Sequence, residues 1–460
     1  MMTKDQLLEL KKNNLKKLYS LLKRNEDNKE IIFILKNLGH LPENFDGSIL
    51  IPLIYSKNKD VRFWAIKNIG KTQDLKYLEI LSKIATNDDY SIIRREAVSS
   101  IGRMRLPQSK PILIKLLDDK DPKVILQAIR GLLVFKKNIS VKNALIKLAD
   151  HPNETIQSVI RREFFKKESS ISIQPHPLSP DFLKNTVVKG DVLEILQYVP
   201  AESIHLTFTS PPYYNARDYS IYESYEAYLN FLTDVFCQIQ RITKDGRFLI
   251  VNTSPVIVPR VSRAHSSKRY PIPFDLHCRI VQNGWEFIDD IVWLKPESSV
   301  KNRNAGFFQH RKPLGYKPNP TTEYLMVYRK ETDKLLDWNM NQYDRDTVEN
   351  SRITGEYETS NIWKIDPTFD RVHSAVFPIE LCNRVISFYS YIGDLVFDPF
   401  AGSGTFGKAA VNLDRYFFLT EIENKYIDRM KVDLEKPFLF QQTETRFLDL
   451  DEFASLSKDT

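Results

Sequence analysis

The sequence predicts two regions of different fold class, an all-α repeat region followed by a three-layer α/β domain with a mainly parallel sheet. Residues 1 to about 170 carry almost no strand signal but contain an internal repeat. From residue 186, short apolar runs rich in β-branched residues alternate with helical periodicity. Between these regions, residues 171–182 hold three prolines, which exclude a continuous helix. We therefore expect an all-α domain over residues 1–172, a linker over 173–185, an α/β domain over 186–437 and a loose C-terminal tail over 438–460.

Bulk composition limits the class of protein. A chain of 460 residues is too long for one ordinary core, and its formal net charge is +7. The three cysteines, Cys237, Cys278 and Cys382, have no metal-ligand spacing, so we expect no metal site and a reducing compartment. No apolar stretch reaches the ~18 residues that would suggest a membrane span. The N-terminus runs into a Lys/Leu-rich helical pattern and not into a signal peptide, so we expect a soluble cytoplasmic protein.

The repeat has four copies, at 61–70, 93–102, 124–133 and, more weakly, 156–164. Equivalent positions follow one another at steps of 32, 31 and 31 residues, and these positions are Ala65, Ala97, Ala128 and Val159. Each copy is preceded by Asp or Asn, which would cap the free amides of a helix start: Asn58, Asp60, Asp88, Asp89, Asp118, Asp119, Asp121 and Asn153. Further apolar helical runs lie between the copies, and two-helix units of this kind stack on their neighbours. The pattern resembles HEAT-like repeats, with an irregular helical bundle as the alternative.

The α/β elements follow in order along the second region. Strands are expected at 203–208, 247–252, 290–294, 323–328, 395–397 and 416–420. Helices are expected at 225–242, 274–282, 377–390 and 407–412. The polar residues 331–360 interrupt this alternation.

A glycine-rich loop follows one of the predicted strands. Residues 398–405 read Asp-Pro-Phe-Ala-Gly-Ser-Gly-Thr, and a helix begins near Thr405. Gly402 and Gly404 allow a tight turn, and the positive end of the helix suits the carboxylate of an amino-acid cofactor as well as a phosphate. Glu421 ends the next strand and can accept hydrogen bonds from ribose hydroxyls, which dinucleotide sites also require. Residues 402–407 satisfy the GxGxxG spacing, so a nucleotide-dependent oxidoreductase is an alternative.

A second motif, Thr-Ser-Pro-Pro-Tyr-Tyr at 209–214, ends a predicted buried strand. It resembles the catalytic loop of DNA methyltransferases that act on exocyclic amines, and residues 398–405 resemble their S-adenosylmethionine loop. Because the catalytic loop comes first, the chain resembles the circularly permuted beta group of that family. The resemblance implies a Rossmann-like, S-adenosylmethionine-dependent methyltransferase fold over about 186–435.

The resemblance also implies roles for individual residues. The Ser210 hydroxyl and the Pro211 carbonyl would accept the amine protons, Pro212 would stiffen the loop, and Tyr213 would stack on a flipped base. The cofactor would contact a set of eleven residues: Asp191, Phe377, Asp398, Pro399, Phe400, Ala401, Gly402, Ser403, Gly404, Thr405 and Glu421. Asp191 is also explained as a capping residue in a surface turn, and the segment around Phe377 as a helix start at Pro378.

The first residue of the Ser-Pro-Pro-Tyr tetrapeptide indicates the acceptor. In the family, Ser is usual for cytosine N4 enzymes, and Asp or Asn for adenine N6 enzymes. Ser210 therefore favours cytosine N4 in double-stranded DNA, with adenine N6 as the alternative. No Pro-Cys dipeptide occurs, which argues against a cytosine carbon-5 enzyme. An inactive methyltransferase domain on a helical scaffold is a further alternative.

Basic residues gather in two runs that would contact DNA phosphates, although such runs are commonly solvated loops. They are Arg260, Arg263, Lys268, Arg269, Lys301, Arg303, Arg311, Lys312 and Lys317. By resemblance, target recognition lies in an insertion at about 298–362, after Trp293-Leu-Lys-Pro296. The repeat region would bind flanking DNA, hold a partner or brace the catalytic domain. A restriction-modification role with a cognate endonuclease is implied by the family alone, and the sequence leaves monomer and homodimer open.

Overall fold

The protein is described from a computed structural model of the 460-residue chain. The structure describes residues 2–24, 27–165, 175–214, 222–258, 262, 264, 268–300, 313–314, 318–368, 376–434 and 444–458. The chain folds as two compact units, Met1–Ser172 and Ile173–Thr460. None of the helices in the described ranges has the length and apolarity of a membrane-spanning segment.

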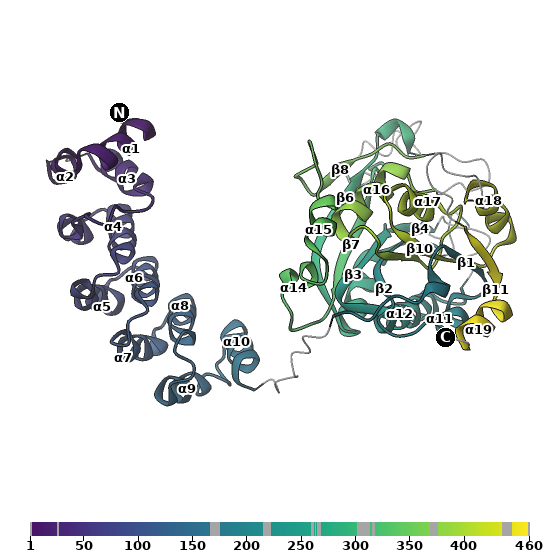
Figure 1. Ribbon diagram of the computed structural model, residues 1–460, viewed down its shortest axis with the longest axis horizontal. Helices are drawn as coiled ribbons and strands as arrows, with labels where there is room; N and C mark the ends of the chain where they lie inside the picture. The colour runs from purple at the N-terminus through teal and green to yellow at the C-terminus, as the bar shows by residue number, and fades with distance from the viewer. Residues whose placement is uncertain are drawn as a thin grey trace. The chain divides into compact units, whose positions relative to one another are not determined.

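The first unit is a stack of helices that contribute buried apolar side chains to one core (Figure 1). In chain order they are α1 (Lys4–Asn13), α2 (Leu15–Arg24), α3 (Asn28–Asn37), η1 (Gly47–Leu50), η2 (Pro52–Tyr55), α4 (Lys59–Thr72), η3 (Leu75–Tyr77), α5 (Leu78–Asn87), α6 (Ser91–Met104), α7 (Ser109–Lys115), η4 (Leu116–Asp118), α8 (Pro122–Leu133), α9 (Ile139–Ile146) and α10 (Glu154–Phe164). The four sequence copies form α4, α6, α8 and α10, which lie in one row, while α5, α7 and α9 form the other (Figure 1).

Helix capping follows the prediction at three of the four repeat helices. Asn58, Asp121 and Asn153 each accept a hydrogen bond from backbone amides at the start of α4, α8 and α10. The expectation is wrong for α6, whose N-cap is Tyr90, without a side-chain cap. Asp88 instead forms a salt bridge with Arg62 of the preceding copy, at 3.2 Å. Asp88 Oδ1 also accepts from the Tyr90 amide at 3.0 Å, so this side chain both bonds the backbone just before α6 and pairs with the preceding copy.

The second unit has three layers around a nine-stranded sheet in the order β11-β1-β10-β9-β2-β3-β7-β6-β8. The sheet strands are β1 (Thr186–Lys189), β2 (Ile204–Thr209), β3 (Thr243–Thr253), β6 (Trp285–Leu294), β7 (Thr322–Lys330), β8 (Ile362–Lys364), β9 (Leu395–Asp398), β10 (Tyr416–Glu421) and β11 (Arg446–Asp449). Strand β7 runs antiparallel to β3 and β6, and the other described neighbours in this sheet are parallel. The short pair β4 (Val256–Val258) and β5 (Lys268–Tyr270) forms a separate ribbon.

Helices cover both faces of the sheet because each face carries apolar side chains. One core contains α11 (Val192–Leu196), α12 (Tyr225–Ile242), α13 (Ile272–Gln282) and α19 (Leu450–Lys458). The other contains α16 (Ile379–Tyr389), α17 (Thr405–Asn412) and α18 (Asn424–Leu434). Short segments η5 (Asp181–Leu183), η6 (Glu297–Ser299), α14 (Leu336–Met340) and α15 (Arg345–Asn350) complete the unit. The predicted three-layer α/β architecture is thus confirmed.

Two boundary expectations are wrong. The residues after 445 are not a loose tail, because β11 pairs in parallel with β1 and Phe453 of α19 is fully buried in the core. The second half of the expected linker also packs against the α/β unit. There the Ser179 hydroxyl donates to the Ser203 carbonyl at 2.6 Å, and Phe182 and Leu183 are buried. Sheet-edge pairing and apolar burial, rather than local composition, decide both segments.

Candidate active site

The two sequence motifs leave adjacent strands at the same edge of the sheet. Strands β2 and β9 are parallel, with Leu206 opposite Val396 and Thr207 opposite Phe397. Beyond this register, the Thr209 hydroxyl donates a hydrogen bond of 2.7 Å to Asp398 Oδ1. The residue before Ser210 is therefore bonded directly to the first residue of the glycine-rich loop. This edge is where open α/β sheets bind ligands.

The glycine-rich loop turns as the sequence predicts. Gly402 and Gly404 have φ values of +52° and +74°, in the left-handed region that favours glycine. Gly404 is the N-cap of α17 and packs tightly, since an added Cβ would lie 2.7 Å from Met430 Cγ. The backbone amides at the start of α17 are therefore directed toward this loop without a side-chain cap.

Glu421 holds the loop against the end of β10. Its Oε2 accepts from the Gly402 amide at 2.8 Å, and its Oε1 accepts from the amides of Ile422 and Glu423, each at 2.9 Å. Each carboxylate oxygen has further lone pairs, so ribose hydroxyls could still donate to it. Glu421 therefore combines a structural role with the binding role expected from the sequence.

Two buried carboxyl groups lie together in this loop. Burial raises the pKa of Asp398 to about 7; hydrogen bonds from Thr209 and the Phe400 amide oppose the rise, and the Glu421 charge adds to it. Burial also raises the pKa of Glu421, against hydrogen bonds from the amides of Glu423, Gly402 and Ile422. Burial is therefore the main reason that both carboxyl groups resist ionisation, and a cationic ligand beside them would favour the ionised forms.

The Ser-Pro-Pro-Tyr loop is braced by a contact that the sequence did not predict. The Tyr213 hydroxyl donates to Glu323 Oε2 at 3.4 Å, and the Lys295 ammonium donates to the other oxygen of Glu323. The Lys295 ammonium also lies 4.2 Å from the ring centroid of Trp293. Burial, and then the Glu323 charge, raises the pKa of Tyr213 well above its usual value, so this phenol is a neutral donor.

A cavity of about 470 Å³ joins the two loops, within the ~300–1,000 Å³ range of small-molecule sites. Apart from Gly404, which faces Met430, all the predicted catalytic and cofactor residues line it: Ser210, Pro211, Pro212, Tyr213, Asp191, Phe377, Asp398, Pro399, Phe400, Ala401, Gly402, Ser403, Thr405 and Glu421. The lining also includes residues that sequence reasoning missed, among them Asn252, Lys295, Glu323 and Tyr426. The available signal was a polar residue at the boundary of a predicted strand, since Asn252 ends one such strand and Glu323 begins another.

For Asp191 and Phe377 the sequence left two alternatives open, a structural role and a place in the cofactor site, and in the structure each residue is consistent with both. Asp191 caps α11 by accepting from the Leu193 amide at 2.8 Å, and it also lines the cavity. Phe377 precedes α16 and stacks on Phe208 with ring centroids 4.5 Å apart, and it lines the cavity too. A structural role therefore does not remove either residue from the site.

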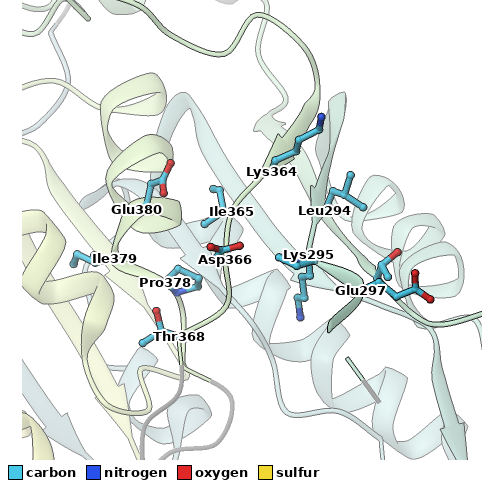
Figure 2. Close-up of a pocket in the computed structure, with 12 residues that line it drawn as sticks. Leu294, Lys295, Glu297, Lys364, Ile365, Asp366, Thr368, Pro378, Ile379 and Glu380 are labelled. Carbon is cyan, nitrogen blue, oxygen red and sulfur yellow. The ribbon is translucent and has the colours of Figure 1, made fainter. Parts of the chain in front are cut away.

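A second cavity, of about 670 Å³, opens beside the first and shares Lys295 and Thr368 with it. Figure 2 shows Leu294 and Lys295 on one side, Pro378 to Glu380 at the start of α16 on the other, and the segment from Lys364 to Asp366 between them. Because Lys295 also donates to Glu323, this second cavity lies beside the contact that braces the Ser-Pro-Pro-Tyr loop.

The structure describes only part of the expected DNA-binding surface. Lys268 and Arg269 are exposed on β5, and the Lys268 ammonium lies 4.7 Å from the ring centroid of Tyr270. The other expected contacts lie outside the described residues: Arg260, Arg263, Lys301, Arg303, Arg311, Lys312 and Lys317.

Comparison with known proteins finds matches for both units. Residues 204–432 match a family model described as DNA methylase, and residues 47–133 and 86–162 match HEAT repeats. The chain is 29% identical to Type II methyltransferase M.Cfr9I of Citrobacter freundii, over 57% of this chain and 92% of that protein. It is 27% identical to Type II methyltransferase M.XycI of Xanthomonas campestris pv. cyanopsidis, over 55% and 88%. Among solved structures, a putative DNA modification methylase of Thermus thermophilus matches with a TM-score of 0.47 and 27% identity, over 57% of this chain and 98% of that chain.

Proposed function

Because residues 204–432 of this chain belong to the DNA methylase family, we propose that the protein is a DNA methyltransferase that methylates the exocyclic N4 amine of cytosine. The observation that carries the proposal is the Thr209–Asp398 hydrogen bond, which joins the catalytic loop to the cofactor loop. The glycine-rich loop would hold S-adenosylmethionine, which would supply the methyl group. The left-handed Gly402, the start of α17 without a side-chain cap and the buried Glu421 fit an amino-acid carboxylate and a ribose at this position.

The catalytic loop orients the amine for direct transfer. An exocyclic amine is a poor nucleophile because its lone pair is delocalised into the ring. Ser210 and Pro211 both line the cavity, and the Ser210 hydroxyl and the Pro211 carbonyl would accept the two amine protons, which leaves the lone pair facing the methyl donor. Tyr213 would stack on the flipped base, and Glu323 holds this ring in position through its hydroxyl. No covalent nucleophile is needed, so positioning and electrostatics supply most of the rate.

Ser210 supports cytosine N4 over adenine N6, because Ser at this position resembles the cytosine N4 enzymes of the family. The similarity to Type II methyltransferases supports a role in a restriction-modification system, with a cognate endonuclease as partner. Adenine N6 is the alternative acceptor.

The test is mass spectrometry of nucleosides from DNA treated with the protein and S-adenosylmethionine. We expect N4-methylcytosine in the treated DNA and none in a reaction with the Ser210→Ala variant. N6-methyladenine as the sole product would refute the cytosine assignment but keep the methyltransferase. The absence of any methylated nucleoside, with several duplex DNAs of mixed sequence, would refute the function itself.

A further inference from the structure

A groove of about 1,000 Å³ runs along the helical repeat unit, far in sequence from the active-site residues. It crosses the C-terminal ends of α4, α6 and α8, which lie side by side in one row of the stack (Figure 1). Its lining contains four cationic residues, Lys71, Arg103, Arg105 and Arg130, and no carboxylate.

Glycines bring the helices together at the floor of this groove. A Cβ on Gly70 of α4 would lie 2.4 Å from Ser100 Oγ of α6, and a Cβ on Gly102 of α6 would lie 3.1 Å from the Cα of Gly131 in α8. The helix backbones are therefore in close contact at these glycines, and this close packing brings the C-terminal ends of the three helices together along the groove.

The cations are only partly neutralised. Arg103, Arg105 and Arg130 are exposed, and Glu96 pairs with Arg103 at 2.7 Å. In the described part of the repeat unit, Arg105 and Arg130 form no salt bridge. Exposed cations without a carboxylate partner are available to an anionic ligand.

The surroundings of Lys71 contain more positive than negative charge. Its ammonium donates to the Gly39 carbonyl at 2.8 Å and to Asn68 Oδ1 at 3.0 Å, neither of which carries a charge. Burial, and then the positive charges of Lys67, Arg103 and Lys11, lower the pKa of Lys71, with Glu96 opposing them. The mutual repulsion of these groups would be relieved by a bound polyanion.

Helix dipoles alone do not explain the arrangement. A cation in the last turn of a helix is stabilised by the carbonyl end, which accounts for a basic residue on each of α4, α6 and α8. It does not require the cations of three helices and Arg105, which follows α6, to line one groove that lacks carboxylates. Asp60, by contrast, lies in the first turn of α4, at the end of the helix away from the groove.

We propose that this groove binds the sugar–phosphate backbone of duplex DNA. The cations lie at the ends of three successive helices in a groove whose lining holds no carboxylate, and contacts from Lys and Arg to phosphates do not select a base sequence. The choice of DNA over an acidic protein rests on the proposed function of the same chain. The groove then supplies affinity that does not depend on sequence, outside the bases that the catalytic unit reads.

The test is DNA binding by the full chain, measured as fluorescence anisotropy of a labelled duplex of mixed sequence over a range of NaCl concentrations. The groove variant is Arg105→Gln with Arg130→Gln, and the matched control is Lys123→Gln with Lys142→Gln, which removes two exposed cations of the same unit that do not line the groove. We expect the groove variant to bind the duplex roughly tenfold more weakly than the wild type. In a plot of the logarithm of the association constant against the logarithm of the salt concentration, the magnitude of its negative slope should be smaller by about 2. The control should bind as the wild type does. Circular dichroism melting checks that both variants are folded.

Equal weakening in the control, or wild-type binding by the groove variant, would overturn the proposal. Polyglutamate that displaces the duplex as effectively as unlabelled DNA would also overturn it, in favour of an acidic protein partner. Methyl transfer keeps this result separate from the proposed function: the groove variant should raise KM for DNA and leave kcat unchanged. A wild type that binds DNA through the groove without methylating it would refute the proposed function and leave the groove assignment standing.

Discussion

Replacement of Asp398 by Asn tests the electrostatics of the site. Asp398 is 1% exposed, and its burial raises the pKa to about 7 from an ordinary 3.8. Because the folded pKa is the higher one, the folded state binds an extra proton between about pH 4 and pH 7. The resulting stability is fully present below the unfolded pKa and is lost as the pH rises through the folded pKa. Between these pH values the free energy of unfolding falls by about 1.4 kcal/mol per pH unit, or roughly 4 kcal/mol over the whole interval.

Asn is a close substitute because Thr209 and the Phe400 amide both donate to the same oxygen, Asp398 Oδ1, which Asn retains. The free energy of unfolding of both proteins is measured by urea denaturation between about pH 5 and pH 8, with tryptophan fluorescence as the signal. The free energy of unfolding of the wild type minus that of the variant should fall by about 1.4 kcal/mol per pH unit up to about pH 7 and then level off. Titrating groups that do not interact with Asp398, such as His205, cancel in this difference. Parallel curves for the two proteins would refute the reasoning.

Three further substitutions test other parts of the account. Tyr213→Ala should slow methyl transfer by roughly 10- to 100-fold through lost stacking while calorimetry shows unchanged S-adenosylmethionine affinity; wild-type turnover would count against the proposed stacking. Gly404→Ala should weaken cofactor binding about tenfold or more, because φ is +74° and the added methyl would lie 2.7 Å from a side chain of α18. The control is Gly355→Ala, where φ is +88° and no atom lies within 4 Å of the added Cβ. An equal loss of cofactor affinity in both variants would point to a general backbone effect. Phe453→Ala should lower the free energy of unfolding by about 3–5 kcal/mol, whereas the exposed Leu456→Ala should not; a stable Phe453 variant would restore the view that the C-terminus is a loose tail.

The strands and helices of the α/β unit could be predicted because their signals are local. The run at 203–208 and the alternating spacing from Tyr225 to Ile242 match β2 and α12 closely. Local chemistry also predicted a tight turn at Gly402 and Gly404, and both glycines are left-handed in the structure. The meeting of the two loops required the resemblance to a family, because no local pattern states that β2 lies beside β9.

Long-range contacts explain what the sequence analysis missed. Glu323 reads as the start of an ordinary strand, and its contact with Tyr213 depends on the position of β7 in the sheet. Residues 446–449 carry a weak strand signal and are ordered by pairing with β1. Asp is a residue type that commonly caps helices, but the side chain of Asp88 forms a salt bridge with Arg62 of the neighbouring repeat. In each case the partner is remote along the chain.

The most direct test of the central claim is to measure transfer and cofactor binding together in the Ser210→Ala variant. Ser210 lies one residue after the Thr209–Asp398 bond, and its hydroxyl is assigned to the amine rather than to the cofactor. With tritiated S-adenosylmethionine and DNA in excess, the variant should transfer label at least roughly 100-fold more slowly, with an unchanged dissociation constant for the cofactor. Transfer at the wild-type rate would contradict the claim that this loop and the glycine-rich loop form one catalytic site.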